Sequence, residues 1–328
     1  MSGDGQVLKA SITSDLDLGP DEGLNEPLEP QLGHGFDAAP VPGKRRRRQW
    51  VQLLIDALHY RRAQIGLALF VFIVAVAVVG PYVAPHSAVE FVTGPYAKPS
   101  SVAVFGSDTL GRDVLSRVLY GGRSVLILGF IATAIGMVLG ITLGLFAGYA
   151  RPAIDDLVMR VLDALLAFPE IIFVLLVVSV VGPRLWLIVV AVGLSHAPRV
   201  ARVARGSTVQ TKEQDFVTAA ESLGVSRVKI AFGEILPAIT SPLFVEFGLR
   251  LTYSICLIAG LSFLGFGMQP PSADWGLMIN ENRLGLAIQP YSVLIPVALI
   301  AILTIGVNLT TDGIARAMIG IERDTGST

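Results

Sequence analysis

The chain has few charged residues and almost no cysteine. Only 16% of its 328 residues are charged, 52% are hydrophobic, and the mean hydropathy is +0.65. A soluble domain carries about 25% charged residues, so this composition argues against a soluble protein and favours one embedded in a bilayer. The single cysteine, Cys256, excludes an internal disulfide, and its apolar surroundings in the sequence predict a small residue packed in the core.

Signatures of nucleotide hydrolysis, metal binding and hydrolase chemistry are also missing. A phosphate-binding loop needs Gly, four residues, then Gly-Lys-Ser/Thr, but the only Gly-Lys pair, Gly43-Lys44, is followed by Arg45. Ser195-His196 is not accompanied by a nucleophile elbow, so we expect a structural histidine. The four histidines are scattered without the spacing of metal ligands: His34, His59, His86 and His196. We therefore expect no enzyme, no metal site and no cofactor bound by this chain.

The N-terminal region differs from the rest. Residues 1–43 hold eight of the 26 acidic residues and one of the 25 basic ones, and they are rich in Gly and Pro. We predict a disordered acidic cytosolic tail, either inert or a docking arm, without the basic start and apolar centre of a signal peptide. Residues 44–62 form a basic juxtamembrane segment, and its run Lys44–Arg48 fits an inside anchor before a span better than a nucleic-acid site.

Six apolar segments approach the roughly 20 residues that a membrane-spanning helix needs. The third contains Pro169, where we expect a kinked helix, because a helix that began there would be too short to cross. In the second, Gly136, Gly140, Gly144 and Gly148 form a small-residue stripe that predicts close helix packing. The segments are predicted at residues 64–83, 124–150, 157–181, 185–203, 238–264 and within 284–311.

Basic residues set the expected orientation. They are concentrated before the first segment, around residues 151–160 and over residues 199–229, which predicts both termini inside. The membrane domain is predicted over residues 63–322, with external loops at about 84–119 and 265–289. A short tail follows at residues 323–328.

A polar interruption separates the fourth and fifth segments, at about residues 206–237. Its small Ala219 and Ala220 precede Gly224, which allows a turn, and Leu236-Pro237 introduces the next apolar segment. This spacing resembles the coupling-helix (EAA) motif of ABC importer permeases, with Thr218 in place of the glutamate. A generic amphipathic cytosolic loop is the alternative.

Two further motifs make the resemblance more specific. The first is Phe105-Gly-Ser-Asp-Thr-Leu-Gly-Arg-Asp-Val-Leu-Ser-Arg117. The second is Leu261-Ser-Phe-Leu-Gly-Phe-Gly-Met-Gln-Pro-Pro271, followed by Asp274-Trp275-Gly276. Over residues 50–322 the chain resembles the second, DppC/OppC-like permease of dipeptide, oligopeptide and nickel importers. The resemblance implies an all-α ABC type I importer permease with six transmembrane helices in the cytoplasmic (inner) membrane.

The resemblance also implies the partners. They are a DppB/OppB-like second permease as a heterodimer, one or two DppD/OppD/DppF-like ATPase subunits that bind ATP and Mg, and a DppA/OppA-like extracytoplasmic peptide-binding protein. Membrane lipid surrounds the complex, and no nucleic acid is expected. The implied function is passage of di- or oligopeptides, with nickel or another small solute as the alternative. A secondary transporter and a membrane anchor of an assembly complex are more remote alternatives. The coupling contacts would be Asp215, Phe216, Ala219, Ala220, Glu221, Leu223, Gly224, Leu236 and Pro237.

Two more groups are candidates. Glu246 and Arg250 lie four residues apart in the fifth segment, where a charge either borders the passage or belongs to a self-neutralised pair. Tyr253 and Asn308, with Ser254 and Thr310, are either passage residues or interhelical hydrogen-bonding partners. The candidate external contacts are Asp108, Arg112, Asp113 and Trp275. Together with Arg117, the charged ones have helical spacing, so a surface helix with ion pairs is the alternative.

Overall fold

The structure, a computed structural model, describes residues 60–325, which are mostly helical. Within these residues, extended backbone pairs only at two isolated bridges, Phe91 with Arg112 and Ser107 with Asp113. The predicted acidic tail and nearly all of the basic juxtamembrane segment lie outside the described residues.

Five of the described helices are long and apolar enough to cross a membrane, and a bent pair, α4 (Pro152–Leu166) and α5 (Glu170–Val181), provides a sixth candidate. The five are α2 (Arg61–Val83), α3 (Val114–Tyr149), α6 (Leu185–Lys212), α10 (Thr240–Phe263) and α12 (Tyr291–Thr325), the last with its apolar part at Tyr291–Ala317. The shorter elements are α7 (Asp215–Ser222), α8 (Arg227–Ile230), the π-helical turn η1 (Ala231–Ile235), α9 (Leu236–Ala238), α11 (Trp275–Asn282) and η2 (Arg283–Gly285).

The predicted third span is broken rather than kinked. It consists of α4 (Pro152–Leu166) and α5 (Glu170–Val181), whose axes differ by 81°. Pro169 is the residue before α5, and it lacks the N–H that a continuous helix would use and also disfavours helical backbone at Phe168. Glu170 then occupies the first turn of α5, where a carboxylate interacts favourably with the helix dipole. The prediction of one long kinked helix was therefore wrong.

Several other helices extend beyond their predicted bounds. α3 begins at Val114, because the Asp113 carboxylate caps it by accepting from the backbone N–H of Ser116 at 2.9 Å. α6 continues to Lys212, beyond the predicted end at residue 203. The prediction was too short because it followed hydropathy, whereas helices cross the boundary between apolar and polar surroundings without a break.

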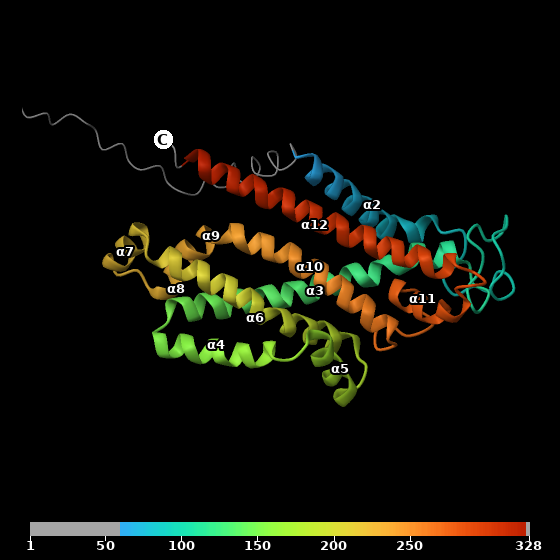
Figure 1. Cartoon of the computed structure of the whole chain (residues 1–328), viewed down its shortest axis with the longest axis horizontal. Coiled ribbons are helices and arrows are strands. Elements are labelled where there is room, and N and C mark those ends of the chain that lie inside the picture. Colours follow the sequence, from blue (N-terminus) through green and yellow to red (C-terminus); the bar gives the residue numbers. More distant parts are fainter. Residues whose placement is uncertain (1–59, 326–328) are drawn as a thin grey trace, which may run out of the picture. The chain divides into compact units, whose positions relative to one another are not determined.

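Close packing of α3 against α6 explains the glycine stripe. A Cβ at Gly140 would lie 2.4 Å from Cβ of Val200, and a Cβ at Gly144 would lie 2.5 Å from the carbonyl oxygen of Ala201. Such distances leave no room for a side chain, so glycine is what lets the two helices approach. Figure 1 shows this pair beside α10, with α2 packed along α12.

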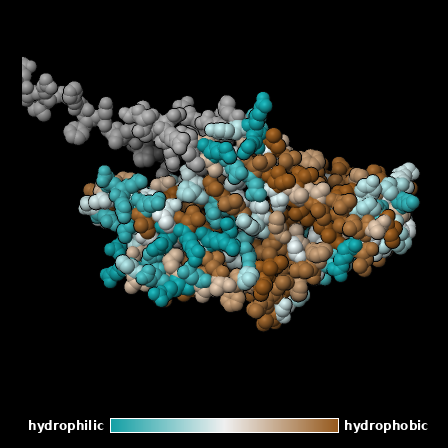
Figure 2. All heavy atoms as spheres, in the orientation of Figure 1, coloured by the Kyte–Doolittle hydropathy of each residue, from teal (hydrophilic) through white to brown (hydrophobic). Residues whose placement is uncertain are grey.

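Hydrophilic and hydrophobic side chains lie at different places along the helices. Figure 2 shows hydrophilic side chains gathered at the end where α7 and α8 lie, and hydrophobic ones over α5 and the neighbouring part of the helices. At the opposite end, α11 covers α3, and Trp275 donates its indole N–H to the carbonyl of Val118 at 2.9 Å. Cys256, predicted in the core, is exposed on α10 instead.

Candidate functional site

The polar segment between α6 and α10 forms the short helix that its sequence predicts. α7 ends in a turn at Gly224, whose φ of +74° favours glycine. The turn is closed by the N–H of Val225, which donates to the carbonyl of Ala220 at 3.1 Å. This hydrogen-bonded pattern satisfies carbonyls at the end of α7 and directs the chain back toward α8.

α7 presents apolar side chains outward. Phe216 is 40% exposed and Leu223 is 83% exposed, whereas Val217 is buried against the bundle. Ala219 is exposed between them and adds little bulk. An exposed apolar surface on a short helix at the hydrophilic end of the bundle suits docking of another protein.

α7 is tied to the long helix α3. The hydroxyl of Tyr149, the last residue of α3, donates to the carboxylate of Glu221. The ammonium of Lys212 lies 5.3 Å from the centre of the same tyrosine ring. Glu221, predicted as a coupling contact, is therefore also an anchor of α7 to the bundle.

Leu236 and Pro237 do not lead directly into α10, although the sequence predicted that they would. They belong to the separate short helix α9, and α10 begins only at Thr240. Pro237 sits at the start of α9, where its missing N–H costs nothing. The prediction that the fifth span starts directly after Pro237 was therefore wrong, because α10 starts at Thr240. The π-helical turn η1 precedes α9.

Glu246 and Arg250 are a buried pair. Oε1 of Glu246 lies 2.8 Å from Nε of Arg250, and their side chains are 9% and 8% exposed. The Arg250 guanidinium also lies 5.0 Å from the centre of the Tyr253 ring. The predicted pairing is present, and its burial favours a structural role over contact with a solute.

The other candidates on these helices differ from one another. Asn308 accepts a hydrogen bond from the hydroxyl of Thr252 at 3.1 Å, and Ser254 contacts Thr133 and His196, so these residues link helices. Thr310 bonds instead to the carbonyl of Gly306 in its own helix. Tyr253 is 53% exposed and is the one of these candidates that faces outward.

The four candidate external contacts are buried, which corrects the expectation of exposed residues. Asp108, Arg112, Asp113 and Trp275 are each at most 2% exposed. Nor do they form a surface helix, because α3 begins only after Asp113. Their helical spacing reflects a loop and the first turn of α3.

Asp108 is the centre of a buried ion cluster. Its Oδ2 lies 2.6 Å from Nε of Arg112 and 2.9 Å from Nη1 of Arg117. Both guanidinium groups also lie 2.9 Å from Oε2 of Glu281 in α11. The cluster joins the loop before α3 to α11. Removal of one partner would leave a buried charge unpaired and would destabilise this end of the chain.

A row of ion pairs between the bent pair and α6 was not anticipated. Arg205 pairs with Asp155 and Arg202 with Asp163, and Nη1 of Arg199 lies 2.8 Å from Oε2 of Glu170. The arginines recur every third residue on α6. The sequence signal was this spacing, together with acids at seven- or eight-residue intervals on the preceding segment.

Glu170 also begins a buried polar chain. Its Oε1 lies 2.7 Å from Nδ1 of His196, whose Nε2 lies 2.9 Å from Oγ of Ser254. Thr133 donates to that serine oxygen at 2.9 Å. His196, Ser254 and Thr133 are inaccessible, so the expected structural role of the histidine fits better than catalysis.

Two protein-family models match parts of the chain. Residues 140–319, which contain α7 and the row of ion pairs, match the family described as binding-protein-dependent transport system inner membrane component. Residues 49–99 match the N-terminal TM domain of oligopeptide transport permease C. The chain belongs to the family of binding-protein-dependent transport system inner membrane components. The match extends over more than half of the chain.

Curated permeases support the same assignment. The chain is 37% identical to the glutathione transport system permease protein GsiD of Pectobacterium atrosepticum, over 77% of this chain and 85% of that protein. It is 38% identical to GsiD of Escherichia coli O6:K15:H31, over 79% and 87%. It is 34% identical to the dipeptide transport system permease protein DppC of Alkalihalophilus pseudofirmus, over 82% and 89%.

The permease fold is also found among solved structures. A chain of the MetNI methionine ABC transporter in an inward facing conformation matches with a TM-score of 0.50 and 18% identity. The match covers 61% of this chain and 95% of that one. The predicted all-α permease fold, with up to six membrane-spanning segments, is confirmed.

Proposed function

We propose that this permease subunit forms half of the passage of an ATP-driven importer of short peptides. The observation that carries the proposal is α7, a short helix that exposes Phe216 and Leu223 at the hydrophilic end of the bundle. ATPase subunits, which supply the ATP and Mg sites, dock on this face from the cytosol. A second permease completes the passage, and an extracytoplasmic binding protein delivers the substrate.

The anchors of α7 provide the route of coupling. α7 follows α6 directly, contacts α3 through Tyr149 and Glu221, and leads through η1 and α9 into α10. Val217 is buried in the core beneath α7, where it packs with residues of η1 and α6. A displacement of α7 by the ATPases is therefore passed to three spans, which is the motion an alternating-access permease requires.

The row of ion pairs lines the passage. Along α6 from Leu185, at about 1.5 Å per residue, Arg199 and Arg202 lie roughly 21 and 26 Å from the start of the helix. With Leu185 taken at the outer membrane surface, both would lie within the roughly 30 Å thickness of a bilayer core, and the side chains of Arg202 and Asp163 are 52% and 54% exposed. Exposed charges at such depth require water or a polar partner, as in a passage.

The passage chemistry suits a zwitterionic solute. Alternating carboxylates and guanidinium groups offer partners to both termini of a peptide. Similar permeases are named for glutathione, itself a small peptide, and for dipeptides, which favours short peptides over nickel. The buried Glu246–Arg250 pair is assigned a structural role.

Reconstitution tests the proposal. The chain, with its partner permease, ATPases and binding protein, is placed in vesicles, and uptake of labelled dipeptide and of glutathione is followed with and without ATP. ATP-dependent uptake that unlabelled peptide competes away, and nickel does not, supports the proposal. Uptake without ATP favours a secondary transporter, and competition by nickel favours a metal importer. A stable complex without any uptake favours a membrane anchor.

A further inference from the structure

Two cavities meet at the end of α3 near α7. One has a volume of about 400 Å³ and the other about 330 Å³, and both lie in the range of about 300–1,000 Å³ typical of ligand pockets. Their shared wall consists of Tyr149, Ala150, Arg151 and Arg227. The two cavities are therefore adjacent compartments with chemically different linings.

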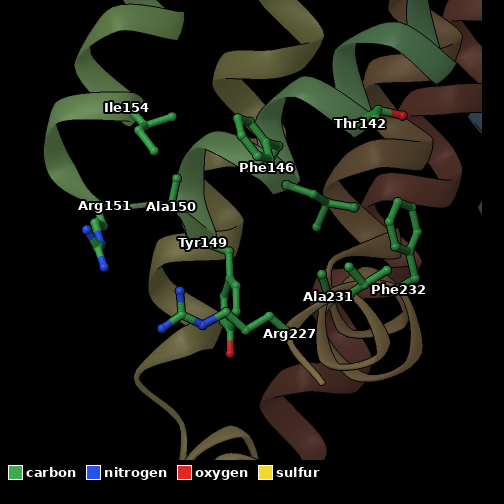
Figure 3. A pocket seen from close by; sticks show the side chains of 11 residues that line it. Thr142, Phe146, Tyr149, Ala150, Arg151, Ile154, Arg227, Ala231 and Phe232 are labelled. Atoms are coloured by element: carbon green, nitrogen blue, oxygen red, sulfur yellow. The ribbon is translucent and has the colours of Figure 1, made fainter. Parts of the chain in front are cut away.

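The larger compartment is apolar. It is lined by the last turns of α3, the start of α4 and the segment of α8 and η1, including Leu145, Ile154 and Ala231. Phe146 and Phe232 at its wall are 56% and 50% exposed. Figure 3 shows Phe146, Ile154, Ala231 and Phe232 around the cavity, with the Arg227 side chain beside the Tyr149 ring in this view. A compartment of this kind accepts a hydrocarbon chain.

The smaller compartment is cationic. Arg151, Lys212 and Arg227 line it against one acid, Glu221, whose carboxylate already accepts the Tyr149 hydroxyl. None of these three basic residues forms an ion pair within residues 60–317, the part of the chain whose side chains are described. By contrast, each of the three arginines of the row on α6 forms an ion pair. The compartment therefore has an unmatched positive charge.

The site lies at the expected depth of a membrane surface. The uncharged run of α3 ends at Ala150, directly before Arg151, and Tyr149 has the position of an interfacial aromatic residue. The basic residues concentrate at this end, which places it at the cytosolic leaflet. Acyl chains and lipid head groups are thus available to the two compartments from the surrounding bilayer.

We propose that this site binds an anionic phospholipid of the cytosolic leaflet. One acyl chain occupies the apolar compartment, and the phosphate lies among Arg151, Lys212 and Arg227. A soluble anion would leave the larger compartment unfilled, and a zwitterionic lipid would leave the positive charge partly unmatched. Because Lys212 lies just before α7 and Glu221 lies within it, the bound lipid also stabilises the connection between the docking helix and α3.

Native mass spectrometry of the full-length chain in detergent tests the site, with phosphatidylglycerol and phosphatidylcholine of the same acyl chains as probes. We expect phosphatidylglycerol to bind more tightly. Arg151→Ala and Arg227→Ala should each weaken it about fivefold, from the contribution of one basic residue to anionic-lipid binding. The matched controls are the single variants Arg160→Ala and Lys229→Ala, each of which removes an exposed basic residue outside both compartments. Each should bind phosphatidylglycerol as tightly as the unchanged chain does.

A second variant tests the apolar compartment without changing any charge. Thr142→Trp places a large ring into the 400 Å³ cavity and should weaken phosphatidylglycerol binding while the basic residues remain. Equal binding of the two lipids would overturn the proposal, as would an equal loss in the control variant. Full competition by glycerol 3-phosphate at the same concentration would identify a site for soluble anions instead.

Discussion

Glu246 and Arg250 lie one turn apart on α10, with Oε1 2.8 Å from Nε and both side chains buried. Each neutralises a charge that the other would otherwise leave in an apolar bundle. Glu246→Gln or Arg250→Gln alone should therefore cost about 3–5 kcal/mol of stability, whereas the double variant should lose less. Thermal unfolding and peptide uptake of the three variants measure this. A loss in the double variant equal to the sum of the two single losses would mean that the two residues act independently.

The contact of α3 with α6 depends on Gly144. Gly144→Ala would place a Cβ 2.5 Å from the carbonyl oxygen of Ala201 and 2.6 Å from Cβ of Ala204. We expect a loss of about 1–3 kcal/mol, measured as a lower unfolding midpoint in detergent. Gly206→Ala on α6 is the control, because it meets open space and should stabilise the helix by up to about 1 kcal/mol. Similar midpoints for the two variants would refute the close packing.

The exposed pair Asp163 and Arg202 separates stability from transport. Both side chains are about half exposed, so their attraction should contribute no more than about 1 kcal/mol. Arg202→Gln should leave the unfolding midpoint nearly unchanged but reduce peptide uptake several-fold, because the proposed passage includes this residue. Arg160→Gln on α4, an exposed arginine without an ion pair in the described residues, is the control and should transport normally. Normal uptake by Arg202→Gln would mean that the row of ion pairs on α6 does not line the passage.

Asp274 should give the chain a measurable pH dependence. The residue caps α11 and also accepts from the Ser124 hydroxyl, and burial raises its pKa above the ordinary value of 3.8. A carboxyl whose pKa is higher in the folded than in the unfolded state binds more protons when folded. Its stabilising contribution is therefore complete below about pH 3.8 and is lost as the pH rises through the folded pKa.

Asp274→Asn removes this titration. Its amide oxygen can accept from the Leu277 N–H as Oδ1 does, and its amide NH2, in place of Oδ2, can donate to the hydroxyl oxygen of Ser124. The unfolding midpoints of the two proteins, measured from pH 4 to pH 8, should diverge in favour of the variant as the pH rises. The difference between the two curves isolates Asp274, because all other groups titrate in both proteins. Parallel curves would show that the folded-state pKa is ordinary.

Local chemistry made much of the fold predictable. Long apolar runs located α2, α3, α6, α10 and α12, and Gly224 marked the end of α7. The break at Pro169 was visible, but its 81° angle was not, since the angle depends on contacts of Glu170 with residues of α6 about 26 positions later. Sequence spacing alone does not report such tertiary partners.

The candidate sites were predictable to different degrees. Glu246 and Arg250 pair across one turn, a local relationship that spacing reveals. Asp108 and Arg112 also have that spacing, but Glu281, which is 169 residues away from Arg112, determines their burial. The cationic compartment at Arg151 and Arg227 likewise combines segments that are distant in the sequence, so no sequence motif indicated it.

In the proposed function the ATPases drive the permease at α7, and Leu223, which directly follows α7, is the most exposed apolar side chain there. ATP-driven peptide uptake by the reconstituted complex carrying Leu223→Asp tests this most directly, with Ser222→Ala as the control because that exposed hydroxyl bonds only within α7. We predict that Leu223→Asp abolishes uptake while the unfolding midpoint of the chain stays unchanged. Uptake at the rate of the control would contradict the assignment of α7 as the coupling helix.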